Sequence, residues 1–158
     1  MTFGPKLESS EALFEQFGKR YQLSDLQLKQ FKQYLLLLQQ FNKMVNLTAV
    51  QSDFEIIERH FEDSLALGVY QKMNRLNSLA DVGSGAGFPG IPLKIAFPHL
   101  QVTLIEVTQK RVNFLQKVID ELGLTLTTVC AQDWRTFLRK SQLTVNCFVS
   151  RASSSSFK

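Results

Sequence analysis

The sequence lacks the marks of a membrane-spanning, exported or metal-binding protein. Its most apolar segment, Leu35–Leu38, is far too short to cross a bilayer, and no basic stretch followed by an apolar stretch opens the chain. The two cysteines, Cys130 and Cys147, show neither C-x-x-C spacing nor a nearby histidine. We therefore expect a cytoplasmic protein without a membrane partner, in which both cysteines are reduced core residues and no metal is bound.

The composition predicts one folded domain, with or without a small appendage, and a mild positive charge. The chain has 158 residues, of which 44% are hydrophobic, and this is enough to bury a core and too much for a disordered chain. Its net charge of +4 is spread along the sequence in small pairs such as Lys110-Arg111. Such a charge is compatible with a nucleic-acid partner without requiring one.

The most informative stretch covers residues 79–92, Leu-Ala-Asp-Val-Gly-Ser-Gly-Ala-Gly-Phe-Pro-Gly-Ile-Pro. An apolar run breaks off there into closely spaced glycines, which is typical of a buried parallel strand ending in a loop that a ligand approaches. A short helix is predicted over 91–97, with Pro92 near its start, where a missing N–H costs nothing. Since open α/β sheets bind ligands at the carboxyl ends of their strands, we expect a nucleotide-like ligand here.

Three interpretations of this loop compete. One is the G-x-G-x-x-G fingerprint of a nicotinamide-dependent oxidoreductase, formed by Gly85, Gly87 and Gly90. Another is an S-adenosylmethionine loop, which we favour because Asp81 lies two residues before Gly83 and prolines stiffen the segment where a pyrophosphate needs a free helix N-terminus. A carboxylate there suits a cationic ligand with amine and hydroxyl groups better than two phosphates. The third is a glycine-rich turn without any ligand.

The part of the chain before the glycine loop is predicted to be helical. Helices are expected over 9–20 and after the capping-box pair Ser24 and Gln27. The second of these carries apolar residues at helical spacing on a stripe wide enough to pack against two neighbours. We therefore expect a helical cap over residues 1–75 and an α/β part over 76–158.

Arg59 and His60 interleave with the apolar face of a further helix before the loop. One interpretation is a solvated helix side with ion pairs, on which His60 is a satisfied, partly buried imidazole. The other is a functional cluster. These residues alone favour the first interpretation.

The α/β part alternates strands and helices regularly. Strands are predicted over 101–107, 126–130 and 143–150, in addition to the strand before the glycine loop. The helix after the first of them is expected to be capped by Thr108 and ended by Gly123. The alternation predicts a right-handed parallel sheet in the order 3-2-1-4, whose fourth strand is an apolar, unpaired edge open to self-association.

The ends of the later strands carry side chains suited to an adenosine ligand. Glu106, roughly twenty residues beyond the glycine loop, is placed to accept hydrogen bonds from ribose hydroxyls. Trp134 follows the third strand, where a flat side chain can stack on an adenine ring, and a core position is the equal alternative. Arg151 ends the fourth strand, and the serine run at 153–156 is predicted to be flexible.

Five ordered motifs together resemble one family. They are Asn46-Leu47-Thr48, Arg59-His60 with Asp63-Ser64, the stretch 81–92, Lys110-Arg111 and Ser150-Arg151-Ala152. This pattern resembles the RsmG family, also called glucose-inhibited division protein B, whose members are bacterial 16S ribosomal RNA guanine-N7 methyltransferases. The resemblance implies a class I S-adenosylmethionine-dependent methyltransferase with a Rossmann-like parallel sheet and an N-terminal helical cap.

The resemblance also implies roles for particular residues. Its cofactor contacts correspond here to Gly83, Phe88, Glu106, Val107, Thr108, Trp134, Arg135 and Arg151. With Asp81, Ser84 and Gly85 of the loop, these form the candidate site for S-adenosylmethionine, and S-adenosylhomocysteine is the expected product. Charge and resemblance together put Arg59, His60, Lys110 and Arg111 on the RNA side.

The expected substrate is 16S ribosomal RNA or a small-subunit assembly intermediate, with the target base out of its stack. Guanine N7 carries a lone pair and no proton, so the transfer needs no general base. Arg151 is the candidate catalytic group, able to hold a guanine O6, a phosphate or the cofactor. Family members continue beyond the Ser-Arg-Ala motif with strands that complete a seven-stranded sheet, so we expect a C-terminally truncated form. A cofactor-binding or RNA-binding module without catalytic activity is the alternative.

Overall fold

A four-stranded parallel sheet forms the centre of the described chain, residues 9–49, 52–70 and 72–151 of the computed structural model. Its strands are β1 (Ser78–Val82), β2 (Gln101–Ile105), β3 (Thr127–Cys130) and β4 (Cys147–Val149). They lie in the order β3-β2-β1-β4, so the predicted strand order and the α/β class are confirmed. The serine run at 153–156 and Ala152 of the last motif lie outside the described residues.

Two strands are shorter than predicted because side chains take over backbone hydrogen bonds at their ends. β2 stops at Ile105, where the Glu106 carboxylate accepts the N–H groups of the next two residues. β4 starts only at Cys147, since the Asn146 amide oxygen accepts the N–H of Ser78 at 3.1 Å where a ladder bond would otherwise form. An apolar strand pattern does not reveal such side-chain contacts.

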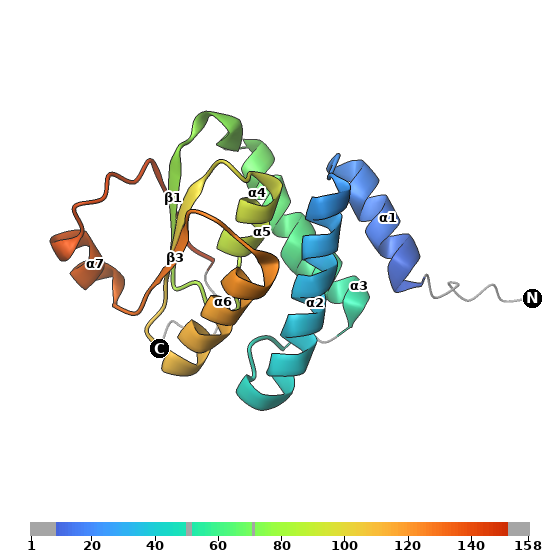
Figure 1. Ribbon diagram of the computed structural model, residues 1–158, viewed down its shortest axis with the longest axis horizontal. Helices are drawn as coiled ribbons and strands as arrows, with labels where there is room; N and C mark the ends of the chain where they lie inside the picture. The colour runs from blue at the N-terminus through green and yellow to red at the C-terminus, as the bar shows by residue number, and fades with distance from the viewer. Residues whose placement is uncertain (1–8, 50–51, 71, 152–158) are drawn as a thin grey trace, which may run out of the picture.

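Helices α5 (Gly90–Ala96) and α6 (Gln109–Leu122) cover one face of the sheet, and α2 (Asp25–Val45) packs against them (Figure 1). The Gln30 amide on α2 donates to the Leu122 carbonyl at 2.9 Å, at the end of α6. Buried apolar side chains of these helices, β1 and β2 form the main core. Removing this apolar surface from water is the main force that holds the layers together.

Among the described residues, only helices precede β1. Besides α2 these are α1 (Ser10–Arg20), α3 (Asp53–Ile56), the π-helix η1 (Ile57–Glu62), α4 (Asp63–Tyr70) and the 3₁₀-helix η2 (Met73–Arg75). Aromatic rings join them: Phe17 meets Phe31 edge-on at 4.9 Å, and Tyr34 stacks on Phe61 at 5.5 Å. One core runs from these helices to the sheet. The domain boundary at residue 75 therefore stays a prediction.

The predicted helix ends lie where they were expected, but one of them lacks its side-chain hydrogen bond. Ser24 and Gln27 form a complete capping box at the start of α2. Gly123 ends α6 in the left-handed conformation, with φ of 63°. Thr108 lies at the N-cap of α6 as predicted, but its side chain makes no cap hydrogen bond with the described residues. The Thr108 N–H is instead held by Glu106 at 2.9 Å.

The opposite face of the sheet is covered, within the described residues, by α7 (Trp134–Lys140) alone (Figure 1). Ala80, Ile105 and Phe137 make a small second core there. Phe148 of the edge strand β4 is 49% exposed. Because an edge strand with an exposed apolar side chain is open to pairing, self-association through β4 stays a prediction.

The described residues contain no helix long and apolar enough to span a membrane. Nor do they bring together three or more His, Cys, Asp or Glu side chains that could hold a metal. Cys130 in β3 and Cys147 in β4 are free thiols, half-buried on opposite edge strands of the sheet. The two cysteines therefore form no disulfide with each other.

Candidate functional site

The first half of the glycine loop, residues 83–85, borders open space, and we call it the open half. The N–H groups of Gly83 and Ser84 donate to the Ile105 carbonyl at 2.9 and 3.0 Å, so the loop folds over the end of β2. Gly83 has φ of +69° and Gly85 has φ of +59°, values that L side chains rarely adopt. A Cβ added to Gly83 meets no heavy atom of the described residues within 4 Å. There is room for a ligand against this backbone.

The second half of the loop, residues 86–90, is tightly packed, and we call it the packed half. A Cβ added to Gly87 would lie 2.6 Å from the Tyr34 hydroxyl oxygen. One added to Gly90 would lie 2.6 Å from a methyl group of Leu104. These two glycines let α2, α5 and β2 approach the loop backbone, so they serve packing rather than a ligand.

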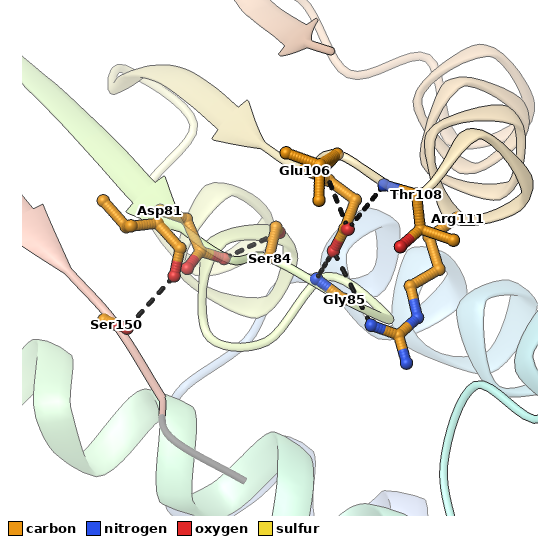
Figure 2. Close-up of polar contacts among 9 residues, drawn as sticks. Asp81, Ser84, Gly85, Glu106, Thr108, Arg111 and Ser150 are labelled. Carbon is orange, nitrogen blue, oxygen red and sulfur yellow. Dashed lines mark hydrogen bonds and ion pairs between the residues drawn. The ribbon is translucent and has the colours of Figure 1, made fainter. Parts of the chain in front are cut away.

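Asp81, on β1, ties both halves of the loop to the sheet. It is fully buried, and its Oδ2 accepts from the Ser84 hydroxyl at 2.8 Å (Figure 2). The same oxygen accepts from the Gly90 N–H at 2.9 Å. Its Oδ1 has no hydrogen-bond partner among the described residues. Burial, and to a lesser degree the charge of Glu106, raises the pKa of Asp81 to about 6 against the effect of the two hydrogen bonds. A buried carboxylate oxygen without a partner favours a cationic or hydroxyl donor beside it.

Glu106, just beyond β2, holds the open half from the other side (Figure 2). It is 4% exposed. Its Oε2 accepts the Gly85 N–H at 2.8 Å, and its Oε1 accepts the N–H groups of Val107 and Thr108, both at 2.9 Å. The Arg111 guanidinium lies 4.0 Å from Oε2. A carboxylate has about four acceptor positions, so Glu106 can take a further donor such as a ribose hydroxyl.

Trp134 and Arg135 lie on the surface at the start of α7. Trp134 is 47% exposed, so it is not a core residue, and the Arg135 guanidinium lies 5.5 Å from the centre of its ring. Asp133 caps α7 by accepting the N–H groups of Arg135 and Thr136 at 3.0 and 3.1 Å. An exposed indole on a capped helix start can stack on a flat ligand. The contact with adenine stays a prediction.

The Phe88 ring is buried in the packed half of the loop. Its centroid lies 5.6 Å from that of Tyr34, and it stacks on the His60 imidazole with centroids 4.4 Å apart. The Phe88 ring is therefore covered by neighbouring aromatic groups. If Phe88 contacts a cofactor, as the family resemblance implies, its backbone is the part available to do so.

Arg151 and His60 are in contact although 91 residues separate them in the sequence. The Arg151 Nη1 and His60 Nδ1 atoms are 2.9 Å apart, and Arg151 Nη2 donates to the Arg59 carbonyl at 2.8 Å. The Thr48 hydroxyl lies 2.9 Å from His60 Nε2. Burial, followed by the charge of Arg151, lowers the pKa of His60 to about 4. The satisfied, partly buried imidazole that the residues alone favoured is confirmed, but the sequence did not reveal Arg151 as its partner.

The cations predicted for the RNA side lie in two places. Lys110 and Arg111 are on the first turn of α6, where Arg111 points toward Glu106 (Figure 2). The Arg59 side chain is exposed on η1, with its guanidinium 3.7 Å from the Glu55 carboxylate. Their contact with RNA stays a prediction.

Tyr34 and Ser150 support the site, although the sequence analysis gave neither of them a role in it. The buried Tyr34 hydroxyl donates to the Ala86 carbonyl at 2.5 Å, and burial raises its pKa well above its usual range. The Ser150 hydroxyl donates to the Val82 carbonyl at 3.1 Å and joins the ends of β4 and β1 (Figure 2). Tyr34 could have been selected from the sequence, because it places a hydroxyl group on the otherwise apolar face of a helix.

Comparisons with known proteins were consistent with one another. A family model described as GidB, rRNA small subunit methyltransferase G, matches residues 27–158. The Ribosomal RNA small subunit methyltransferase G of Bacillus subtilis (strain 168) is 42% identical over 119 residues, which cover 75% of this chain and 50% of that protein. The protein of the same name from Leuconostoc citreum (strain KM20) is 47% identical over 104 residues, 65% of this chain and 44% of that one. This chain spans about half the length of the curated relatives it matches.

Proposed function

We propose that this chain, which belongs to the GidB family of rRNA small subunit methyltransferase G, binds S-adenosylmethionine at the carboxyl edge of its sheet. The observation that carries the proposal is the open space beside Gly83, in the half of the glycine loop whose Gly85 N–H is held by the Glu106 carboxylate. The fold is the α/β parallel sheet of the class I S-adenosylmethionine-dependent methyltransferases. The proposed reaction is methylation of guanine N7 in 16S ribosomal RNA.

The residues of the site fit the chemical groups of this cofactor. Glu106 has acceptor capacity left for ribose hydroxyls, and the unpartnered Asp81 Oδ1 suits the amino group of the methionine part. The exposed Trp134 ring suits the adenine. Two phosphates would instead meet two carboxylates, which disfavours a nicotinamide dinucleotide.

The reaction requires that the protein align the two reactants, and it requires no general base. When bound, the cofactor supplies a sulfonium methyl group; the bond from that methyl to guanine N7 forms as its bond to sulfur breaks. Positive charge moves from sulfur onto the purine, and N7 loses no proton. The chain's task is therefore to hold the base in line and to keep water out. Arg151 is the proposed catalytic residue, through contact with guanine O6, a phosphate or the cofactor.

The proposed partner is 16S ribosomal RNA, free or in a small-subunit assembly intermediate, and the proposed location is accordingly the cytoplasm. Arg59, Lys110 and Arg111 are exposed or half-exposed cations that suit contacts with phosphates. A cofactor-binding or RNA-binding module without catalysis is the second candidate. This candidate is favoured by the sheet face opposite α5 and α6, which α7 alone covers among the described residues.

Radiolabelled methyl transfer tests the proposal. The chain is incubated with methyl-labelled S-adenosylmethionine and either unmethylated 16S rRNA or small subunits, and label at guanine N7 is measured. We expect transfer that Glu106→Gln weakens and Glu121→Gln, the same change in an exposed ion pair of α6, does not. Cofactor binding without transfer would support the non-catalytic module, and binding of nicotinamide dinucleotide would contradict both candidates.

A further inference from the structure

The guanidinium of Arg151 is held on several sides by one helical segment. Nη1 lies 2.9 Å from His60 Nδ1, and Nη2 donates to the Arg59 carbonyl at 2.8 Å. The Asp63 carboxylate lies 3.8 Å away. The side chain is still 38% exposed, so it is anchored without being closed off from a ligand.

The helix is widened at this point. Residues Ile57–Glu62 form a π-helix between α3 and α4, and both Arg59 and His60 belong to it. π-Helical turns are rare, and they occur frequently at functional sites. Here the widened turn presents a backbone carbonyl and an imidazole nitrogen side by side to one arginine.

Donor and acceptor chemistry fixes the state of the imidazole. An arginine has only donors, so His60 Nδ1 must present its lone pair to Nη1. The proton of the neutral ring is then on Nε2, where it can be donated to the Thr48 hydroxyl at 2.9 Å. The charged groups that face the ring are Arg151 and Arg59, which lower the pKa of His60, and Asp63, which raises it. Burial lowers that pKa most strongly, in keeping with a neutral ring.

We propose that His60 is a positioning residue: its Nδ1 lone pair and the Arg59 carbonyl together fix the Arg151 guanidinium at the carboxyl end of β4. Thr48 holds the imidazole in the required tautomer, and the Phe88 ring, stacked at 4.4 Å, supports its face. Only the purpose of this device, presentation of Arg151 to the substrate, rests on the proposed function. His60 thus acts through Arg151 and not by its own contact with RNA.

The device is sensitive to acid. Protonation of His60 would turn Nδ1 into a donor and set two cations face to face, so it would release Arg151. The reverse also holds, because removing the Arg151 charge makes protonation of His60 easier. The pKa of His60 therefore shows whether Arg151 is in contact with it, and measuring this pKa needs neither cofactor nor RNA.

The experiment is ¹⁵N NMR of the two histidines in the full chain, over a pH titration, in the wild type and in Arg151→Ala. We expect wild-type His60 to carry its proton on Nε2 and to stay neutral through mildly acidic pH. In Arg151→Ala we expect its pKa to rise by about one unit. His99, whose Nε2 lies 3.0 Å from the Leu76 carbonyl, serves as the internal control.

Arg139→Ala is the matched control variant, since it removes one exposed charge from α7, away from Arg151, and should leave the His60 titration unchanged. A proton on Nδ1 in the wild type, or the same His60 titration with and without Arg151, would overturn the proposal. Failure of methyl transfer would not, because the NMR readout is independent of the reaction.

A second pair of variants separates the two contacts of the imidazole. Asn places an acceptor near Nδ1, whereas Gln reaches the Nε2 position, so His60→Asn should keep Arg151 ordered and His60→Gln should not. Relaxation of the Arg151 side-chain Nε resonance measures this order. Equal mobility of Arg151 in the two variants would contradict the assignment.

Discussion

The two halves of the glycine loop use the same residue type for opposite purposes. A Cβ added to Gly83 would enter open space, whereas one added to Gly87 or Gly90 would lie 2.6 Å from a neighbouring atom. The open half therefore leaves room for a ligand, and the packed half brings helices close to the sheet. A glycine-rich motif is in this case part binding site and part packing interface.

Two carboxylates hold the loop. Glu106 accepts the Gly85 N–H of the open half, whereas Asp81 accepts both the Ser84 hydroxyl of the open half and the Gly90 N–H of the packed half. Glu106 is surrounded by backbone donors on both of its oxygens, while Asp81 keeps one oxygen without a partner among the described residues. Substitutions in the packed half should therefore change stability most, and substitutions in the open half should change ligand binding most.

The largest effect is expected from Gly90→Ala. The added methyl would lie 2.6 Å from Leu104 Cδ2 and 2.7 Å from Asp81 Oδ2, so β1 and α5 must move apart. We expect the free energy of unfolding to fall by about 3 kcal/mol, as for an overpacked core. Urea denaturation followed by circular dichroism measures this loss. Unchanged stability would show that the packed half is not packed as described.

Asp81→Asn should reveal the titration of the buried carboxyl. Its folded pKa, about 6, lies above the ordinary value of 3.8, so its contribution to stability is present below pH 4 and is lost as pH rises through 6. Asn resembles the protonated carboxyl and does not titrate. The stability of the variant relative to the wild type should therefore increase by about 2 kcal/mol between pH 4 and pH 7.

Urea unfolding at a series of pH values measures this difference. Asp120→Asn is the control, because Asp120 lies on the exposed side of α6, where it accepts from Gln116. Parallel pH profiles for Asp81→Asn and the wild type would mean that Asp81 titrates normally.

Local signals in the sequence were enough to predict the scaffold. The alternation of apolar strand and helix segments, together with the right-handed crossover of parallel strands, predicted the strand order. The Ser24–Gln27 box and Gly123 predicted two helix ends, because a helix end depends on neighbouring residues only. Thr108 occupies the N-cap position of α6, but its side chain makes no cap hydrogen bond with the described residues, and nothing in the neighbouring sequence shows this.

The details of the site depend on contacts between distant segments, and these could not be predicted. Glycine spacing does not show that Tyr34 of α2 and Leu104 of β2 fill the space beside Gly87 and Gly90. Nor does the helix pattern around His60 show that a π-turn brings it to Arg151. Glu106 and Trp134 could be selected because strand ends in this fold meet at one edge.

Glu106→Gln is expected to have a smaller effect on stability and a clear effect on binding. The amide offers one acceptor oxygen in place of two, so one of the backbone N–H groups it held loses its partner. We expect a loss of about 1–2 kcal/mol in unfolding free energy. Binding of S-adenosylhomocysteine should weaken by about tenfold, since one lost hydrogen bond to a charged group is worth that much. Unchanged affinity would place the ribose elsewhere.

Gly83→Ala should cost the least stability of these variants. Its methyl enters open space but must adopt φ of +69°, which costs about 1 kcal/mol. The same methyl would stand in the space assigned to the ligand, so binding should be lost almost completely. A variant that loses stability but keeps its affinity would contradict the distinction between the two halves.

The most direct test of the central claim is calorimetric titration of this chain with S-adenosylhomocysteine, with oxidised nicotinamide dinucleotide as the control ligand. We predict saturable one-site binding of the first, loss of that binding in Gly83→Ala, and no binding of the second. If a chain that unfolds cooperatively in urea binds neither ligand, or binds the dinucleotide instead, the open half of the glycine loop is not an S-adenosylmethionine site.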